Sequence, residues 1–237
     1  PMRAVWAGLL TAALVAYAHH KFMWHRRTSA WYEVSDVRQE THDAWTLVLK
    51  PAGQHAAFRY LPGQFHFVTL YRAGIAPEEH PFSISSSPAD QRVLASTIKE
   101  SGDFTQTIKH TKPGDRALVR GPYGRFSHLL APPADRLVFL AGGVGITPFI
   151  SMLRYMRDSG EWCPTVLLYA NKTEHDILFR AELDAIVEQS RGQVRVVHLL
   201  SRAGESWVGE QGRLDLDRLR RHTSPFTGTR FYVCGPP

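Results

Sequence analysis

The sequence predicts a small antiparallel β-barrel followed by a doubly wound parallel α/β domain, both preceded by the end of a transmembrane helix. Three observations support this fold class. An uncharged apolar run opens the chain, short strand-like runs split by Pro and Gly fill residues 28–133, and strands alternate with helices over residues 134–237. Short strands with turn signals are typical of a barrel, whereas alternating strands and helices indicate a parallel sheet.

The composition is that of an ordinary folded protein with room for a full core. Of 237 residues, 43% are hydrophobic and 21% are charged. Only Cys163 and Cys234 are cysteines, which excludes a disulfide framework and gives no spacing for a metal or iron–sulfur site. The formal net charge of +6 favours anionic partners. The positive charges form no single stripe, so we expect no nucleic-acid partner.

Residues 1–27 are interpreted as the end of the last transmembrane helix and a basic juxtamembrane linker. Residues 4–18 carry no charge and would form a helix of about 22 Å, at ~1.5 Å per residue. A bilayer core requires about 20 residues, and position 1 is Pro, so we expect the chain to start further upstream. Aromatic and basic residues over 19–27 are typical of the cytoplasmic interface. A buried or amphipathic helix of a soluble protein is the alternative. A signal peptide fits poorly, because aromatic and basic residues stand where a small-residue cleavage site is expected.

Residues 28–133 contain the runs that predict the barrel. The turn pairs Pro62-Gly63, Pro113-Gly114 and Gly121-Pro122 separate them. One helix is expected over residues 104–110. The predicted strands are residues 32–38, 44–50, 64–71, 93–99 and 115–120.

Residues 134–237 follow a different pattern, in which buried-type strands alternate with helices, so the domain boundary is expected near residues 131–135. The sequence stops soon after the last strand, so we expect this domain to be truncated at its C-terminus. The predicted strands are residues 136–141, 165–170, 194–200 and 230–234, and the predicted helices are residues 148–157, 174–189 and 216–221.

A glycine-rich turn over residues 141–148 follows the first of these strands and opens a helix. Gly143 and Gly145 let the backbone approach a diphosphate, and the helix N-terminus offers free N–H groups. Thr147 and Pro148 suit a first helical turn. The pattern is GxGxxP rather than the common GxGxxG dinucleotide fingerprint.

Two further motifs lie in the barrel region. In His80-Pro81-Phe82-Ser83, a hydroxyl beside an aromatic ring suits a flat heterocycle, although a Ser-rich turn is the simpler interpretation. Lys99 precedes a Gly-Asp turn at Gly102 that offers a cation and amides to a diphosphate. A plain helix cap at Asp103 is the alternative.

In their order and spacing, these motifs resemble the ferredoxin–NADP reductase superfamily. More narrowly, they are similar to the dehydrogenase half of membrane ferric reductases and NADPH oxidases, where an HPF[ST] segment replaces the usual arginine-aromatic-x-serine motif. The residues of these motifs are most similar to those of bacterial predicted ferric reductases. The resemblance covers roughly residues 30–237. Its motifs are PGQF at 62–65, HPFS at 80–83, GDFT at 102–105, GPYG at 121–124, GGVGITP at 142–148 and CGPP at 234–237.

The resemblance implies an FAD site on the barrel. Phe82 would stack on the isoalloxazine, and Ser83, implied as a catalytic residue, would lie near its N5. His80, Lys99 and the amides of residues 102–105 would hold the diphosphate. The implied FAD-binding residues are His80, Pro81, Phe82, Ser83, Lys99, Gly102, Asp103, Phe104 and Thr105.

The resemblance also implies a nicotinamide dinucleotide site on the second domain. Cys234, implied as the second catalytic residue, and Gly235 would line the nicotinamide pocket; a nucleophilic Cys234 is a rival interpretation, but no paired histidine motif accompanies it. In the superfamily, a pair such as Ser201-Arg202 clamps a 2′-phosphate, which favours NADPH. NADH remains possible, because such a pair also occurs in some NADH-using relatives. The implied diphosphate-binding residues are Gly143, Gly145, Thr147 and Pro148.

The function implied is that of a membrane-anchored flavin oxidoreductase. It would pass a hydride from NADPH to FAD and then single electrons to haem b in an upstream membrane domain of the same chain, reducing ferric iron or oxygen. Its expected partners are NAD(P)H, that haem domain and membrane lipid. Its expected location is the inner membrane of a bacterium, with residues 28–237 cytoplasmic. The alternatives are a soluble or iron–sulfur-linked NAD(P)H oxygenase reductase and a non-catalytic basic binding module.

Overall fold

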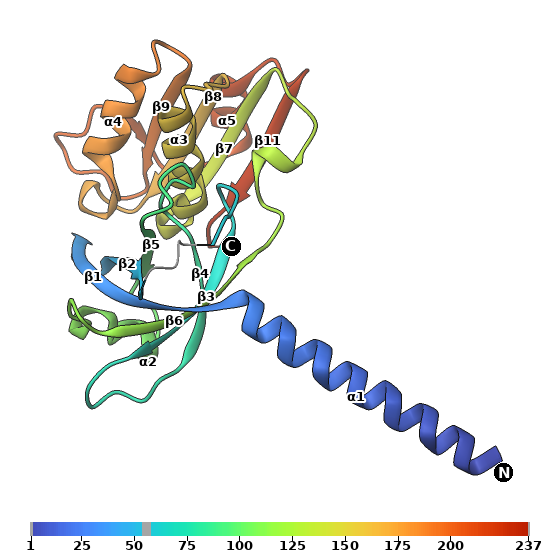
Figure 1. The fold of residues 1–237 in the computed structure, drawn as a ribbon. Coiled ribbons are helices and arrows are strands. Elements are labelled where there is room, and N and C mark those ends of the chain that lie inside the picture. The colour runs from blue at the N-terminus through green and yellow to red at the C-terminus, as the bar shows by residue number, and fades with distance from the viewer. Residues whose placement is uncertain (1, 54–57, 237) are drawn as a thin grey trace.

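Two β-sheets of different kinds form the body of the computed structural model, and one long helix precedes them (Figure 1). The structure describes residues 2–53 and 58–236, with only the backbone given for residues 3, 4 and 20–28. The first sheet is antiparallel, in the order β4-β3-β6-β1-β2-β5, and the second is parallel, in the order β10-β9-β8-β7-β11. This arrangement confirms the predicted antiparallel domain followed by a parallel α/β domain.

The first sheet closes on itself beyond its edge strands. The N–H of Ser85, just after β4, donates to the carbonyl of Ala95 in β5 at 2.8 Å. The prediction missed β4, because Pro81 and the serines after it indicated a turn; a proline is tolerated there because β4 is an edge strand. The elements are β1 (Ser29–Thr41), β2 (Ala44–Pro51), β3 (Phe65–Tyr71), β4 (Glu79–Ser83), β5 (Leu94–Lys99), α2 (Asp103–Gln106) and β6 (Arg116–Tyr123), with 3₁₀ turns at Ile108–His110 and His128–Leu130.

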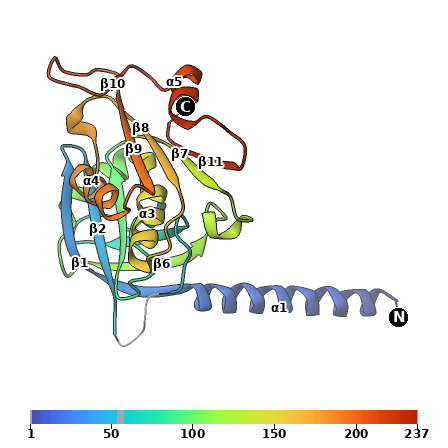
Figure 2. The same ribbon diagram turned by 90° about the horizontal axis from the view of Figure 1, so that it is seen from above.

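In the second sheet, helices cover both faces, as expected for a doubly wound domain (Figure 2). The helix predicted over residues 174–189 is broken, because Phe179 adopts a left-handed conformation (φ 58°) just before α4. The elements are β7 (Arg136–Gly142), α3 (Thr147–Ser159), β8 (Thr165–Asn171), α4 (Arg180–Gln189), β9 (Val194–Leu200), β10 (Glu210–Gln211), α5 (Leu216–Thr223) and β11 (Thr229–Cys234), with 3₁₀ turns at Gly143–Ile146 and Glu174–Asp176.

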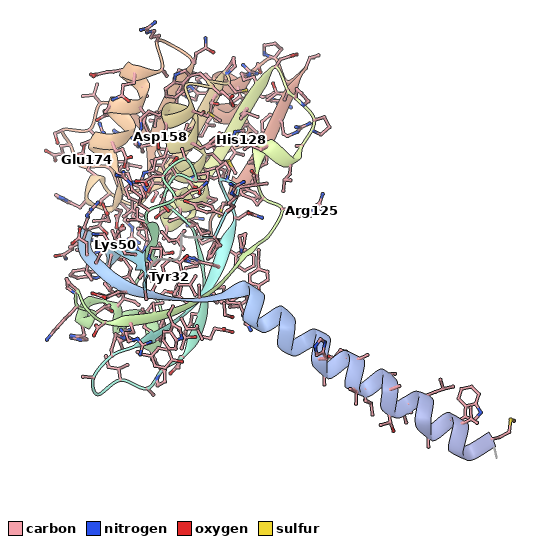
Figure 3. All side chains as sticks on the ribbon, in the orientation of Figure 1. Tyr32, Lys50, Arg125, His128, Asp158 and Glu174 are labelled. Atoms are coloured by element: carbon pink, nitrogen blue, oxygen red, sulfur yellow. The ribbon has the colours of Figure 1, made fainter. Side chains whose placement is uncertain are left out.

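Each domain has its own hydrophobic core. Residues such as Leu49 and Val119 fill the barrel. Between the second sheet and α3, the rings of Phe139 and Phe149 stack with centroids 4.7 Å apart. Figure 3 shows side chains filling the region between the two domains, with Tyr32 labelled on the barrel and the second domain above it. In the second sheet, β8 and β9 lie on one side of β7 and β11 on the other, so the winding direction switches at β7.

Helix α1 (Met2–Thr28) extends away from the body of the molecule (Figures 1 and 2). Its apolar side chains are exposed, including Trp6 at 67% and Leu10 at 64%. Among the described residues, no helix combines the length and the apolar character that crossing a bilayer requires. The end of a transmembrane helix expected within residues 1–27 therefore stays a prediction. The predicted linker is also helical, up to Thr28.

Candidate functional site

The glycine-rich turn lies at the carboxyl end of β7, where the sheet switches direction. Gly143 adopts a positive φ of 51°, and a Cβ there would meet no atom within 4 Å, so the surface of the turn is open. The Thr147 hydroxyl donates to the carbonyl of Val144 at 3.0 Å, and Pro148 lies in the first turn of α3. Helix α3 continues directly from the 3₁₀ turn Gly143–Ile146, where the N–H of Thr147 donates to the carbonyl of Val144. The first amides of that 3₁₀ turn precede any helical acceptor and lie at the positive end of the helix dipole. A diphosphate group fits this arrangement.

The end of β11 packs directly on this turn. A Cβ on Gly145 would lie 2.2 Å from the carbonyl oxygen of Cys234 and 2.8 Å from the Cα of Gly235. The structure therefore brings together four predicted residues from two distant segments, Gly143, Gly145, Cys234 and Gly235. Burial raises the pKa of the Cys234 thiol, which keeps it protonated and argues against a nucleophilic role.

Tyr169, in β8, supports the turn from below and was missed by the sequence analysis. Its hydroxyl donates to the carbonyl of Gly143 at 3.1 Å and accepts from the N–H of Leu178 at 3.3 Å. The ring is fully buried. A tyrosine in an otherwise aliphatic buried strand is the signal that would have found it, because a buried hydroxyl requires a partner.

On the barrel, three aromatic rings bring β4 next to the start of α2. The ring of His80 stacks on that of Phe104 with centroids 3.9 Å apart, and the rings of Phe82 and Phe104 are nearly parallel at 6.3 Å. The buried Arg72 lies over Phe104 and donates to the carbonyl of Thr107 at 2.8 Å. The structure therefore places the aromatic residue implied for flavin stacking beside the turn implied for the diphosphate.

The two basic side chains expected to hold the FAD diphosphate already have carboxylate partners. Lys99 Nζ lies 2.8 Å from Oδ2 of Asp43, and His80 Nε2 lies 3.1 Å from Oε2 of Glu78. The Thr105 hydroxyl accepts the N–H groups of Ser101 and Gly102 at 2.8 and 2.9 Å. A diphosphate at this turn would compete with Asp43 for Lys99 and with Glu78 for His80, which the sequence did not indicate. The ring of Phe82 and the first amides of α2 fit FAD without such competition.

Ser83 lies at the end of β4, which was not predicted, and the Ser201-Arg202 pair follows β9, as predicted. Ser83 is half-buried at the end of β4, opposite Phe65 of β3. After β9, the N–H groups of Ser201 and Arg202 donate to the carbonyls of Asn171 (3.0 Å) and Lys172 (2.8 Å). The Arg202 side chain is exposed, and among the described side chains no carboxylate pairs with it. It is available to an anionic ligand.

An open groove of about 900 Å³ lies beside β9, away from these residues. Its walls include Arg180, His198 and Trp207. None of the residues predicted to bind a cofactor lines it. The residues predicted to bind the dinucleotide, at the glycine turn and the end of β11, lie outside this groove.

Comparison with known proteins identifies two domain families along the chain. Residues 33–127 match the model of an FAD-binding domain, and residues 139–237 match that of an oxidoreductase NAD-binding domain. These two matches correspond to the antiparallel and the parallel sheet, and they show FAD and NAD(P)H as the cofactors.

Individual relatives agree with this assignment. NADH-cytochrome b5 reductase 1 of Kluyveromyces lactis is 34% identical over 160 residues, which cover 66% of this chain and 56% of the relative. The glycine betaine monooxygenase reductase subunit of Pseudomonas aeruginosa is 34% identical over 206 residues, covering 84% and 55%. The chain thus spans about half the length of these curated relatives. The cytochrome b5 reductase domain of Ulva prolifera nitrate reductase shares the fold, with a TM-score of 0.77, 22% identity and coverage of 89% and 88%.

Proposed function

Because this chain belongs to the ferredoxin reductase-like superfamily, with one FAD-binding and one NAD-binding oxidoreductase domain, we propose that it passes a hydride from NADPH to FAD and releases the electrons singly to haem. Bound FAD supplies the ability to accept an electron pair and to release single electrons. The observation that carries the proposal is the packing of Cys234 and Gly235 on the open turn at Gly143 and Gly145, which supports a nicotinamide pocket beside the dinucleotide turn.

The chain's own residues bind and orient the two cofactors. Phe82 would offer flat apolar surface to a ring system, and the first amides of α2 would hold a diphosphate. The 3₁₀ turn at Gly143–Ile146 and the start of α3 would hold the diphosphate of the dinucleotide. Cys234, kept as a neutral thiol, would line the nicotinamide pocket and would not act as a nucleophile.

The central test is direct. Purified full-length protein loaded with FAD should absorb near ~450 nm, as oxidised flavin does, and should bleach on anaerobic addition of NADPH. The proposal would be overturned if the protein takes up no FAD, or if NADPH fails to bleach the bound flavin.

Arg202→Ala tests the preference for NADPH. Losing a charge-assisted hydrogen bond to the 2′-phosphate should raise the KM for NADPH by about tenfold or more. NADH lacks this phosphate and is the internal control, so its KM should change less than about twofold. Steady-state kinetics with both dinucleotides measure this difference. An equal rise for both would show that Arg202 does not read the 2′-phosphate.

Ser83→Ala tests the proposed position of this hydroxyl near flavin N5. Removing a neutral hydrogen bond should slow FAD reduction by up to about tenfold and leave FAD affinity within about twofold. Anaerobic stopped-flow reduction and FAD titration measure the two quantities. Ser35→Ala, which removes a hydroxyl from β1 of the same domain, should leave the reduction rate unchanged. An unchanged rate of FAD reduction in Ser83→Ala would show that the Ser83 hydroxyl has no role in the reaction.

The acceptor and the location are further parts of the proposal. The HPFS motif at residues 80–83 supports a haem-containing membrane domain as acceptor, and the exposed apolar side chains of α1, such as Leu10, support attachment to the inner membrane of a bacterium. The remainder of the chain would then be cytoplasmic. Spectra of the full-length protein in membranes test this part, since NADPH should reduce a b-type haem.

A second candidate is a reductase component that delivers electrons to a separate protein. It is favoured by the likeness to the Pseudomonas aeruginosa reductase subunit over 84% of this chain. In that case the full-length protein would show no haem absorption, and its reduced flavin would reoxidise only when the partner protein is added.

A further inference from the structure

Two side chains of α3 bind the backbone segment that follows Ser83. Nη1 of Arg154 donates to the carbonyl of Ser85 at 2.6 Å, and the Ser151 hydroxyl donates to the carbonyl of Ser86 at 2.7 Å. Ser85 and Ser151 are fully buried. Because Ser85 and Ser86 come two and three residues after Ser83, these bonds hold the end of β4 against the second domain.

The guanidinium of Arg154 is itself held in one orientation. Its Nε and Nη2 donate to the two carboxylate oxygens of Glu182 in α4, at 2.8 and 2.6 Å, and it lies over the ring of Phe179 at 5.0 Å. Such a bidentate pair fixes geometry as well as charge. Burial raises the pKa of the Glu182 carboxyl, but Arg154 and Arg157 outweigh it and hold that pKa below its ordinary value. The remaining Nη1 is the group that crosses to the barrel.

The barrel holds the opposite side of the same segment. The N–H of Ser85 donates to the carbonyl of Ala95 at 2.8 Å, and the Ser86 hydroxyl accepts the N–H of Ala95 at 3.0 Å. The Tyr60 hydroxyl lies 2.8 Å from that of Ser86. The segment is therefore hydrogen-bonded to β5 on one side and to α3 on the other.

The same helix begins at the dinucleotide turn. Arg154 lies about two helical turns after Thr147, roughly 10 Å along the axis at ~1.5 Å per residue. We propose that Arg154, assisted by Ser151, is a positioning residue that sets the distance between Ser83 and the glycine turn, and thereby between the flavin and the nicotinamide. This inference rests on the proposed function. Hydride transfer requires reacting atoms about 3–3.5 Å apart, and a 1 Å misplacement can cost ~100-fold in rate.

Arg154→Met keeps an unbranched side chain at the same backbone position and removes the guanidinium with its hydrogen bonds. In the FAD-loaded full-length protein, single-turnover FAD reduction at saturating NADPH should slow by about tenfold or more, with FAD content and NADPH affinity within about twofold. Arg157→Met is the matched control, because Arg157 also pairs with Glu182, at 3.2 Å, but makes no hydrogen bond to any described residue of the barrel. Its reduction rate should stay within about twofold of the unmodified protein. Equal slowing in both variants would overturn the inference.

Ser151→Ala is the second probe, and it decides the matter if Arg154→Met fails to fold or to retain FAD. It should slow reduction in the same sense by a smaller factor, and a normal rate would overturn the inference. If unmodified protein reduces FAD with NADPH while the variants behave like their control, only this inference fails. If unmodified protein does not reduce FAD, the proposed function fails first.

Hydrogen exchange in the cofactor-free protein gives a readout independent of activity. Amides over residues 84–87 should exchange at least about tenfold faster in Arg154→Met than in Arg157→Met, because opening becomes easier once a clamping bond is lost. Equal exchange in the two variants would show that Arg154 does not hold this segment.

Discussion

Replacing Gly145 by valine is expected to lower the rate of NADPH-dependent FAD reduction by at least about 100-fold, since small shifts of a bound reactant are that costly. Any Cβ at this position would lie 2.2 Å from the carbonyl oxygen of Cys234 and 2.6 Å from its carbonyl carbon. Both atoms belong to the backbone, so neither can rotate away. The first turn of α3 and the end of β11 must separate, and the dinucleotide surface is lost. Titration with NADP⁺ and anaerobic stopped-flow reduction measure the effect.

Gly204→Val provides the matched control for this change. Gly204 lies in the same domain, and its Cβ would meet no atom within 4 Å. Its variant should reduce FAD within about twofold of the unmodified rate, since exposed substitutions are close to neutral. FAD content should be retained in both variants. Normal NADP⁺ binding by Gly145→Val would contradict the site described above.

The second large effect concerns stability rather than binding. Gly63→Ala should lower the free energy of unfolding by about 3 kcal/mol, from the left-handed backbone and the overpacking together. Gly63 has a φ of 92°, and a Cβ there would lie 2.1 Å from the carbonyl oxygen of Phe126 and 2.4 Å from Cε of Met152. Urea denaturation followed by fluorescence measures the loss.

Gly74→Ala separates the two contributions. Gly74 also has a positive φ, 74°, but its Cβ would meet no atom within 4 Å. Only the backbone strain remains, so its variant should lose about 1–2 kcal/mol. Equal losses at Gly63 and Gly74 would show that the contact with Phe126 and Met152 does not matter.

Local patterns predicted most of the fold. The strand expected over residues 194–200 matches β9, and the alternation of strands and helices after residue 133 predicted the parallel sheet. The failures have physical causes. Nothing local marks Phe179 for the left-handed conformation that breaks the predicted helix, and Pro81 conceals a strand that is possible only because it lies at an edge.

The candidate site divides in the same way. Gly143 and Gly145 were predictable because a strand, a turn and a helix follow one another within a short segment. The pairing of Lys99 with Asp43 and the bond from Arg154 to Ser85 join residues far apart in the sequence. Such pairs depend on tertiary packing, and a single sequence carries no signal for them. The assigned roles of Ser83 and Cys234 remain predictions.

The shared use of α3 limits how modular the protein is. The first turn of α3 forms part of the proposed ligand surface of the second domain. Ser151 and Arg154, further along the same helix, donate hydrogen bonds to the backbone of the barrel. Grafting a foreign nucleotide domain at the connection near residues 131–135, in order to change coenzyme preference, would also exchange these two anchors. In a chimaera of this protein, the segment at Ser85 and Ser86 and the helix that binds it therefore have to be transplanted together. We expect the two domains to change in a correlated way during evolution.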